Sequence, residues 1–375
     1  MMSWRTPSLE HPPAPETPRF ILWVFIMLVV GITGFGIGVY LSANEMLPDT
    51  MNNMMIILVF AVLPALLIPS IGYFIYSLAV YRHQLFTDML DDSHQEWRLW
   101  AGKHLGLLAH SRLTKINEEN KDGLILSSLP PNKDNVLTLN LLKLLPSWEK
   151  KEKAIQTLLT PVAEYYHQHT LTQPITFYWQ AEQSDTDLTS LIREEATRLS
   201  LNIESIEPLA YATLAEWLSA LYEEPFDLKL YAILSYQSDD TDLSEEASCL
   251  LLSPQKLYER LHIPANIKLL RPLSTDINDF PQALKIQCEF QLTGAQLTSV
   301  WHSGVTDNNK KKCTESYYLQ GITCISEQLY DADTFLGKGG CARHAATLSL
   351  AGEYPKNQLV VYQNQETLLL QQILS

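Results

Sequence analysis

The sequence predicts two transmembrane α-helices followed by a cytoplasmic α/β domain. Two observations carry this prediction. Residues 20–41 and 54–81 contain no charged residue, and about 20 apolar helical residues are enough to cross the hydrocarbon core of a bilayer. Beyond Leu171, strand-like and helix-like segments alternate, which is typical of a layered α/β domain. We therefore divide the chain into a disordered tail (1–19), a transmembrane hairpin (20–81, with spans 20–41 and 54–81), a helical stalk and linker (82–170) and an α/β domain (171–375).

The tail is rich in proline and poor in apolar residues, a composition typical of disorder. A signal peptide would pair an apolar run of about 7–15 residues with a cleavage site, so the longer run at 20–41 indicates a membrane span instead. Arg5 and Arg19 precede the first span, Arg82 follows the second, and the loop between them has no basic residue. Because Lys and Arg resist translocation, both termini should face the cytoplasm. The expected location is a bacterial inner membrane, crossed twice.

Neither span contains an ionisable residue, so the hairpin should serve as an anchor and not as a transport path. Gly34 and Gly38 form a small-xxx-small pair that lets two helix backbones approach closely. They predict either packing against the second span or a homo-oligomer of the first. Pro64 and Pro69 should kink the second span.

In the stalk, apolar residues recur at helical intervals from 83 to about 110, and they include Trp97 and Trp100. The two tryptophans are interpreted either as core residues or as a ridge that binds a partner. Residues 117–135 are rich in Asn, Asp, Lys and Pro and should form a loop. A helix is expected over 147–169.

The α/β domain is predicted from its apolar periodicity and its turn residues. Strands are expected at 175–179, 228–236, 247–252, 267–270, 284–290 and 358–362, and helices over 188–199, over 209–221 and from Ser253-Pro254 onward. No internal repeat is visible in the sequence.

Charge and motifs exclude several function classes. Nearly all of the net charge of −15 lies beyond residue 81, and nucleic-acid binding draws on clustered Lys and Arg, so no nucleic-acid partner is expected. The five cysteines form no CxxC pair, which fits reduced thiols in a cytosolic compartment. GxSxG, P-loop, HExxH and GxGxxG motifs are missing. No metal or cofactor is expected, and His167 and His169 should lie on different faces of a helix end.

Two blocks are the candidate site: residues 301–309 and residues 338–346. Each places a histidine, His302 or His344, beside small residues that let the backbone turn tightly and approach a ligand. Lys338 and Cys341 complete the set of candidate residues. The alternative interpretation is that the histidines are ordinary loop residues and that the glycines serve turns.

The first block resembles the histidine loop of thiolase-like condensing enzymes, and the second resembles their lysine and glycine-histidine loop. The segment 246–252 is similar to their strand of small residues, so the resemblance spans about 225–360. It implies that His302 and His344 polarise a thioester carbonyl, with Lys338 as their neighbour. The family's acyl-accepting cysteine belongs in the first half of the fold, but no cysteine precedes Cys249. Arg343 also stands where the family's spacing would place the second histidine.

Without a thiolate no acyl-enzyme forms, so we interpret the domain as a degenerate thiolase-like scaffold used for binding, with no established catalytic residue. The layout resembles accessory proteins of bacterial secretion machinery, including the lipase adaptors of type VI systems. The leading hypothesis is therefore a non-catalytic inner-membrane adaptor that binds a secreted effector or a secretion component. Two alternatives stay open. One is a membrane-associated acyl-thioester enzyme with Cys341 as a relocated nucleophile, and the other is a structural membrane protein that assembles through Gly34 and Gly38.

Overall fold

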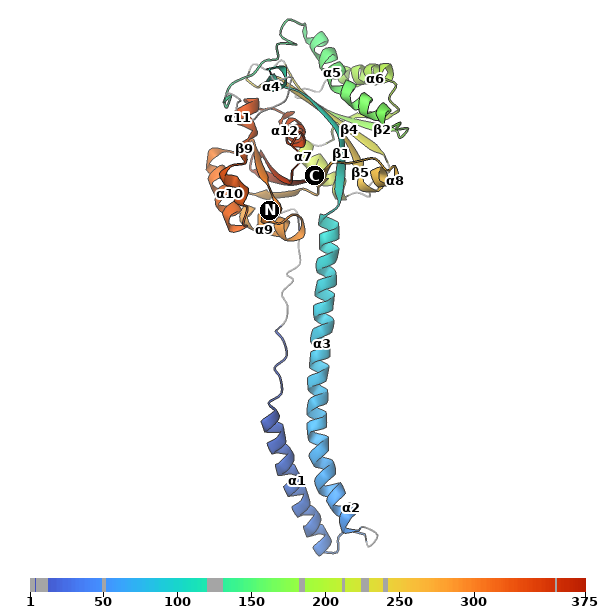
Figure 1. Cartoon of the computed structure of the whole chain (residues 1–375), viewed down its shortest axis with the longest axis vertical. Coiled ribbons are helices and arrows are strands. Elements are labelled where there is room, and N and C mark those ends of the chain that lie inside the picture. Colours follow the sequence, from blue (N-terminus) through green and yellow to red (C-terminus); the bar gives the residue numbers. More distant parts are fainter. Residues whose placement is uncertain are drawn as a thin grey trace. The chain divides into compact units, whose positions relative to one another are not determined.

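The computed structural model describes residues 4, 13–48, 52–119, 131–181, 186–210, 213–223, 229–238, 242–354 and 356–375 (Figure 1). The chain divides into two compact units. One is Pro7–Glu96, and the other is Trp97–Ser375 together with Met1–Thr6. Each unit is described by itself.

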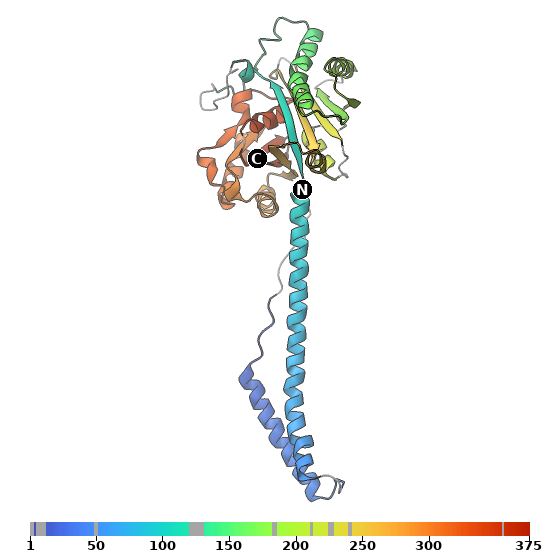
Figure 2. The ribbon, with the colours of Figure 1, turned by 45° about the vertical axis from the view of Figure 1, so that its right-hand side comes forward.

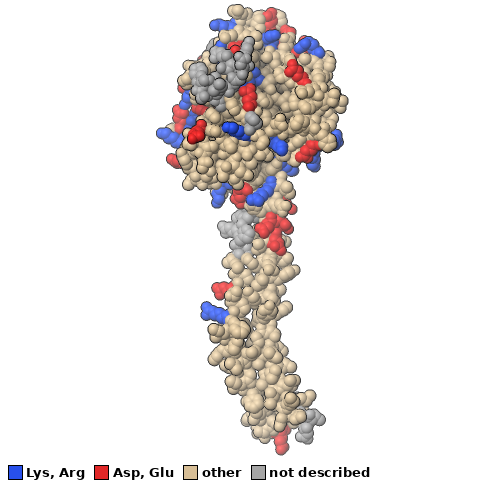
Figure 3. All heavy atoms as spheres, in the orientation of Figure 1, with Lys and Arg blue, Asp and Glu red and all other residues tan. Residues whose placement is uncertain are grey.

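The first unit is helical. It contains α1 (Phe20–Ala43), α2 (Asn53–Ile57), a π-helical turn (Leu58–Val62) and most of α3 (Leu63–Ala101). Helix α1 and the continuous helix Asn53–Ala101 are both long and apolar enough to cross a membrane. Figure 3 shows the surface of these helices as largely uncharged, in agreement with the predicted apolar spans.

The glycines of α1 face the second apolar helix of the same chain. A β-carbon on Gly34 would lie 1.8 Å from the Phe60 carbonyl oxygen, and one on Gly38 would lie 2.9 Å from a methyl carbon of Ile56. Only glycine permits this approach of the two backbones. The chain's own helix therefore lies against Gly34 and Gly38, which is the first of the two expected arrangements. The homo-oligomer stays a prediction.

The second unit is built on one mixed sheet. Its strands follow the order β3-β2-β4-β5-β1-β6-β11-β10-β8-β9, and β7 pairs with β11. The strands are β1 (His104–Leu113), β2 (Ile175–Ala181), β3 (Ile203–Pro208), β4 (Leu230–Gln237), β5 (Glu246–Pro254), β6 (Ile267–Leu270), β7 (Leu273–Asp276), β8 (Ser299–Ser303), β9 (Leu329–Asp331), β10 (Gln358–Asn364) and β11 (Thr367–Leu374). The helices are α4 (Lys115–Glu119), α5 (Ser147–Gln168), α6 (Thr186–Arg198), α7 (Leu214–Glu223), α8 (Gln255–Arg260), α9 (Phe280–Phe290), α10 (Asp307–Leu319), α11 (Ala332–Leu336) and α12 (Arg343–Gly352), with short 3₁₀ turns at Gly294–Gln296 and Thr323–Ser326.

The backbone of this unit is duplicated. The run β1-α5-β2-α6-β3-α7-β4-β5 produces the spatial order β3-β2-β4-β5-β1, and the run β6-α9-β8-α10-β9-α12-β10-β11 produces the matching order β9-β8-β10-β11-β6. Parallel and antiparallel pairs also correspond between the halves. The halves join where β1 pairs antiparallel with β6. The repeat absent from the sequence is therefore present in the topology.

Three hydrophobic cores define five layers, which can be followed in Figure 2. A central core contains side chains of α7 and α12 with both half-sheets. Helices α5 and α6 cover the outer face of the first half, and α9 and α10 cover that of the second. Successive strand residues alternate between cores: Tyr231 and Ile233 of β4 face the central core, whereas Ala232 faces the outer one.

Two predicted elements are wrong. Residues 284–290 form the second half of helix α9 instead of a strand. The helix predicted over 83–110 ends at Ala101, and strand β1 begins at His104. Because β1 lies at the centre of the sheet and α5 packs in the outer core, the boundary expected at 170/171 falls inside the α/β unit, which begins at Trp97.

The two stalk tryptophans belong to this second unit, and both are half-buried in it. The Trp97 ring packs against Trp100 at 4.9 Å and against Phe290 at 6.1 Å. Trp4 of the predicted disordered tail is buried, stacks edge-on against Trp100 at 5.2 Å, and donates its indole N–H to the Pro272 carbonyl at 3.0 Å. At least this residue of the tail is held in place. Residues 1–3 and 5–12 lie outside the described part of the chain.

Candidate functional site

A cavity of about 590 Å³ lies at one end of the central layer. The carboxyl ends of parallel strands from both halves reach it, through Gln180 in β2, Tyr362 in β10 and Gly304 directly after β8. Thr213 and Cys341, which precede α7 and α12, also line it. Ligands of α/β proteins bind at the carboxyl ends of strands. The duplicated fold therefore places a candidate site where its two halves meet.

A glycine loop before α12 forms one wall of the cavity. Gly337 has a φ of +77°, and a β-carbon there would lie 2.5 Å from the Asn135 carbonyl oxygen. The next residue, Lys338, donates its backbone N–H to the same carbonyl at 2.9 Å, and its own carbonyl accepts from Ser244 N at 2.8 Å. These contacts fix the loop and leave the Lys338 side chain exposed at the rim of the cavity.

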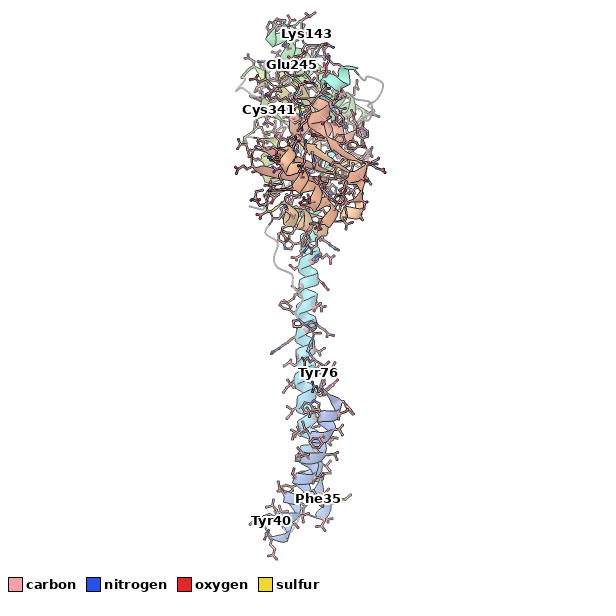
Figure 4. All side chains as sticks on the ribbon, turned by 90° about the vertical axis from the view of Figure 1, so that its left-hand side faces the viewer. Phe35, Tyr40, Tyr76, Lys143, Glu245 and Cys341 are labelled. Carbon is pink, nitrogen blue, oxygen red and sulfur yellow. The ribbon has the colours of Figure 1, made fainter. Side chains whose placement is uncertain are left out.

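Cys341 lies in the cavity wall and is half-buried. Its thiol lies 3.2 Å from Gln237 Oε1 and 3.5 Å from the Tyr236 carbonyl, both at the end of β4. Figure 4 labels this residue within the second unit. It directly precedes the N-cap residue Ala342 of α12, where the helix dipole favours negative charge. Such a thiol is accessible to a ligand in the cavity.

Arg343, at the position where the resemblance would place a histidine, ties the glycine loop to the sheet. Its guanidinium donates to Glu246 Oε2 at 3.0 Å, to Asp333 Oδ1 at 2.8 Å and to the Gly337 carbonyl at 2.8 Å. Arg343 and Glu246 are both almost completely buried. Burial raises the pKa of the Glu246 and Asp333 carboxyls, and the positive charge of Arg343 opposes that rise. With these partners, the Arg343 side chain has a structural role: it holds the glycine loop against the sheet.

His302 faces away from the cavity. It is in β8, and its Nε2 lies 2.8 Å from the Tyr317 hydroxyl in the outer core under α10. Its neighbours in the strand, Trp301 and Ser303, point the other way, and Ser303 hydrogen-bonds Thr347 of α12 at 3.0 Å. Burial lowers the pKa of His302 to about 4, so the ring is neutral near pH 7. Because successive strand residues face opposite sides of a sheet, His302 lies on the side of β8 that faces away from the cavity.

His344 is in the central layer but is sealed from the cavity. Its ring stacks on Tyr362 with a centroid separation of 4.5 Å and an interplanar angle of 7°, and Tyr362 is the residue that lines the cavity. Neither ring nitrogen of His344 has a hydrogen-bond partner among the described residues. Burial lowers its pKa to about 3. The imidazole is therefore neutral and screened by Tyr362.

The structure thus brings together Lys338 and Cys341 and excludes the two histidines from the cavity. Thr213, which was not among the predicted site residues, directly precedes α7. Thr213-Leu214-Ala215-Glu216 has the spacing of a capping box, and the Thr213 hydroxyl accepts from Glu216 N at 3.2 Å. That hydroxyl caps the helix. Residues 211 and 212 lie outside the described part of the chain.

No protein-family model matches the sequence, and no curated protein matches it at a significant level. Among solved structures, the ketosynthase domain OzmH KS8 for oxazolomycin from Streptomyces albus JA3453 is similar with a TM-score of 0.50 at 9% identity, covering 73% of this chain and 95% of that chain. The 3-oxoacyl-[acyl-carrier-protein] synthase III of Aquifex aeolicus VF5 has a TM-score of 0.45 at 8% identity, and OleA of Xanthomonas campestris has 0.44 at 10%; each covers 73% of this chain and 99% of its own.

The similarity to the ketosynthase domain confirms the thiolase-like fold that the resemblance implied. At this level of identity the comparison concerns the fold alone.

Proposed function

We propose that this chain is a membrane-anchored, non-catalytic thiolase-like protein whose α/β unit binds a protein partner. The observation that carries the proposal is the loss of the catalytic arrangement. His302 faces the outer core, His344 is buried behind the Tyr362 ring, and Arg343 forms an internal ion pair with Glu246. No cysteine precedes Cys249, and Cys249 is completely buried in β5, where its thiol cannot meet a substrate to accept an acyl group.

The anchor in this proposal is formed by α1 and the helix Asn53–Ala101, which cross the bilayer as a hairpin. Their length and hydropathy support that role, as do the basic residues that flank the spans and the lack of any in the loop between them. The α/β unit then faces the cytoplasm of a bacterial cell.

The partner docks on exposed apolar side chains of the segment that enters α5, which we call the α5 patch: Leu141, Leu144 and Trp148. Their side chains are 43%, 93% and 64% exposed. Exposed aromatic and aliphatic side chains in one place mark interaction sites, and Trp is enriched among the residues that dominate binding energy. In an acidic chain, the segment 141–153 carries four lysines and two glutamates. The matching partner surface is an apolar groove with an acidic rim.

The loop that carries the patch is held in place before any partner binds. Glu118 accepts the backbone N–H groups of Asn140 at 2.8 Å and Leu141 at 2.7 Å. Glu245 accepts the N–H of Leu139 at 2.7 Å and pairs with Lys150 at 3.2 Å. Figure 4 labels Glu245 and Lys143, which both belong to this unit. A preorganised loop loses little conformational entropy on binding.

A second candidate function is favoured by the position of Cys341 in the cavity. Its thiolate would attack the carbonyl carbon of an acyl thioester, forming a new thioester at Sγ and releasing the carrier thiol. The similar solved structure with a TM-score of 0.50 is by name a ketosynthase domain, which supports this alternative. The details of an adaptor, such as a type VI effector as its cargo, rest on the layout of the chain alone.

The deciding experiment is affinity purification from native membranes with crosslinking, followed by mass spectrometry. A Leu144→Ser, Trp148→Ser double variant should lose a protein that the unchanged chain recovers. Leu319→Ser is the matched control, because Leu319 of α10 is also highly exposed, at 77%. It should retain the partner, as should Cys341→Ser. Retention by the double variant would rule out the α5 patch. An acyl mass on the intact protein that disappears in Cys341→Ser would favour the enzyme.

A further inference from the structure

A second cavity, of about 500 Å³, lies at the edge of the first half-sheet. It shares no lining residue with the first cavity. Its floor is the central face of β2, β3 and β4, and α7 supplies one wall through Trp217 and Leu221. Strand β3 is the last strand of the sheet, so the cavity opens where another chain can approach.

The strand register brings an aromatic ring and a carboxylate together on this floor. Tyr178 of β2 pairs with Glu207 of β3, and Thr176 pairs with Ser205. Residues in register point to the same face of a sheet, and all four line the cavity. Glu207 is exposed, and no partner of its carboxylate is recorded among the described residues.

Three aromatic rings gather beside Glu207. Tyr178 lies 5.1 Å from the Trp217 ring and 6.5 Å from that of Tyr231, and Trp217 lies 6.2 Å from Tyr231. Trp217 and Tyr231 are nearly buried, whereas Tyr178 is partly exposed. The negative face of an aromatic ring attracts cations, so the rings and the carboxylate favour the same kind of ligand.

A second carboxylate, Glu204, is already paired. It lies 2.8 Å from Lys229 and accepts from the Thr176 hydroxyl at 3.2 Å, and the contact with Lys229 lowers its pKa. Both partners of this ion pair are more than a third exposed, so the pair is weak. An incoming cation can therefore compete with Lys229 for Glu204 while it binds Glu207.

We infer that this cavity binds the guanidinium group of an arginine side chain presented by another protein. Guanidinium is planar, stacks on aromatic faces and donates two parallel hydrogen bonds to a carboxylate. An ammonium group is more strongly hydrated and does not stack. The inference goes beyond the proposed function, because it uses none of the residues of the α5 patch.

The test uses the full chain in detergent micelles, labelled with 5-fluorotryptophan, with the Trp217 resonance assigned from Trp217→Phe. N-acetyl-arginine amide should shift this resonance with a millimolar dissociation constant. N-acetyl-citrulline amide, which has the same shape without the charge, should bind about tenfold more weakly. Free arginine should bind no better than the blocked form, because its own carboxylate is repelled by the Glu207 carboxylate. Equal shifts from arginine amide and citrulline amide would overturn the inference, and tighter binding of free arginine would assign the cavity to the amino acid.

Three variants complete the test. Glu207→Gln should weaken arginine amide binding about fivefold to tenfold, whereas Glu194→Gln, an exposed change of equal charge on α6, should leave it unaltered. Lys229→Met should strengthen binding, because it releases Glu204, and a gain of affinity cannot arise from unfolding. Unchanged affinity in Glu207→Gln, or a loss in Lys229→Met, would refute the arginine site.

Discussion

His344→Phe should stabilise the protein. The imidazole is buried, and neither of its nitrogens has a hydrogen-bond partner among the described residues. A buried unsatisfied polar group costs about 1–3 kcal/mol. Phenylalanine removes that cost and keeps the ring stacked on Tyr362. Its slightly greater volume offsets part of the gain, so the free energy of unfolding should rise by about 1–2 kcal/mol at pH 7.

The stabilisation by His344→Phe should increase as the pH falls. Burial lowers the pKa of His344 to about 3, from an ordinary value of 6.5. Above pH 6.5 the ring is neutral in both the folded and the unfolded states and contributes no pH dependence. Between pH 6.5 and 3 only the unfolded state takes up the proton, so the wild type loses about 1.4 kcal/mol per pH unit to this group. Phenylalanine cannot be protonated. At pH 5 the difference in free energy of unfolding between the variant and the wild type should be about 2 kcal/mol larger than at pH 7.

The assay is guanidinium-induced unfolding of the full chain in detergent, followed by tryptophan fluorescence at pH 7 and pH 5. His169→Phe, at the half-exposed end of α5, is the control and should change stability by no more than about 0.5 kcal/mol at pH 7. A destabilised His344→Phe variant, or a difference that does not depend on pH, would refute the reasoning. Either result would mean that the imidazole has a partner or that it reaches the cavity.

Three further results are expected. Arg343→Met should lower the free energy of unfolding by about 3–5 kcal/mol, because it leaves Glu246 buried and unpaired. Adding Glu246→Gln should recover part of that loss, and denaturant titration measures both variants. Gly337→Ala should lower the melting temperature, since a β-carbon at φ +77° would lie 2.5 Å from a backbone oxygen; a normal melting temperature would mean that the loop moves freely. Iodoacetamide should label the half-buried Cys341 well before Cys249, whose pKa burial raises to about 12; peptide mapping measures the order.

Several elements of the α/β unit follow from local sequence. Strands β2, β4, β5, β6 and β10 lie where they were predicted, because each is a short apolar run bounded by turn residues. Helix α5 also lies where it was predicted, after Pro146, and its apolar residues follow a helical period. Helix α9 was taken for a strand because Leu284, Ile286, Cys288 and Phe290 alternate with polar residues. That alternation conceals the helical spacing of Phe280, Leu284 and Gln287, all of which are buried in the folded unit.

The candidate site shows what local sequence cannot decide. The glycine loop and its Lys338 and Cys341 were found from composition, because small residues before a helix indicate a close backbone approach. Whether a histidine beside such a loop reaches a ligand depends on which face of its strand or helix points inward. His302 lies on the outer face of β8, one residue from Ser303, which faces the central layer.

The amino-acid sequence alone establishes the two apolar helices, the acidic character of the remainder and the absence of any cysteine before Cys249, since each is a property of composition along the chain. The tertiary structure decided the duplication, the burial of both histidines and the cavity beside Glu207. Each of these depends on side chains brought together from segments far apart in the sequence: Tyr362 covers His344, and Tyr178 joins Glu207 through the pairing of β2 with β3. Strand register and layer packing, which are properties of the whole fold, determine which residues meet.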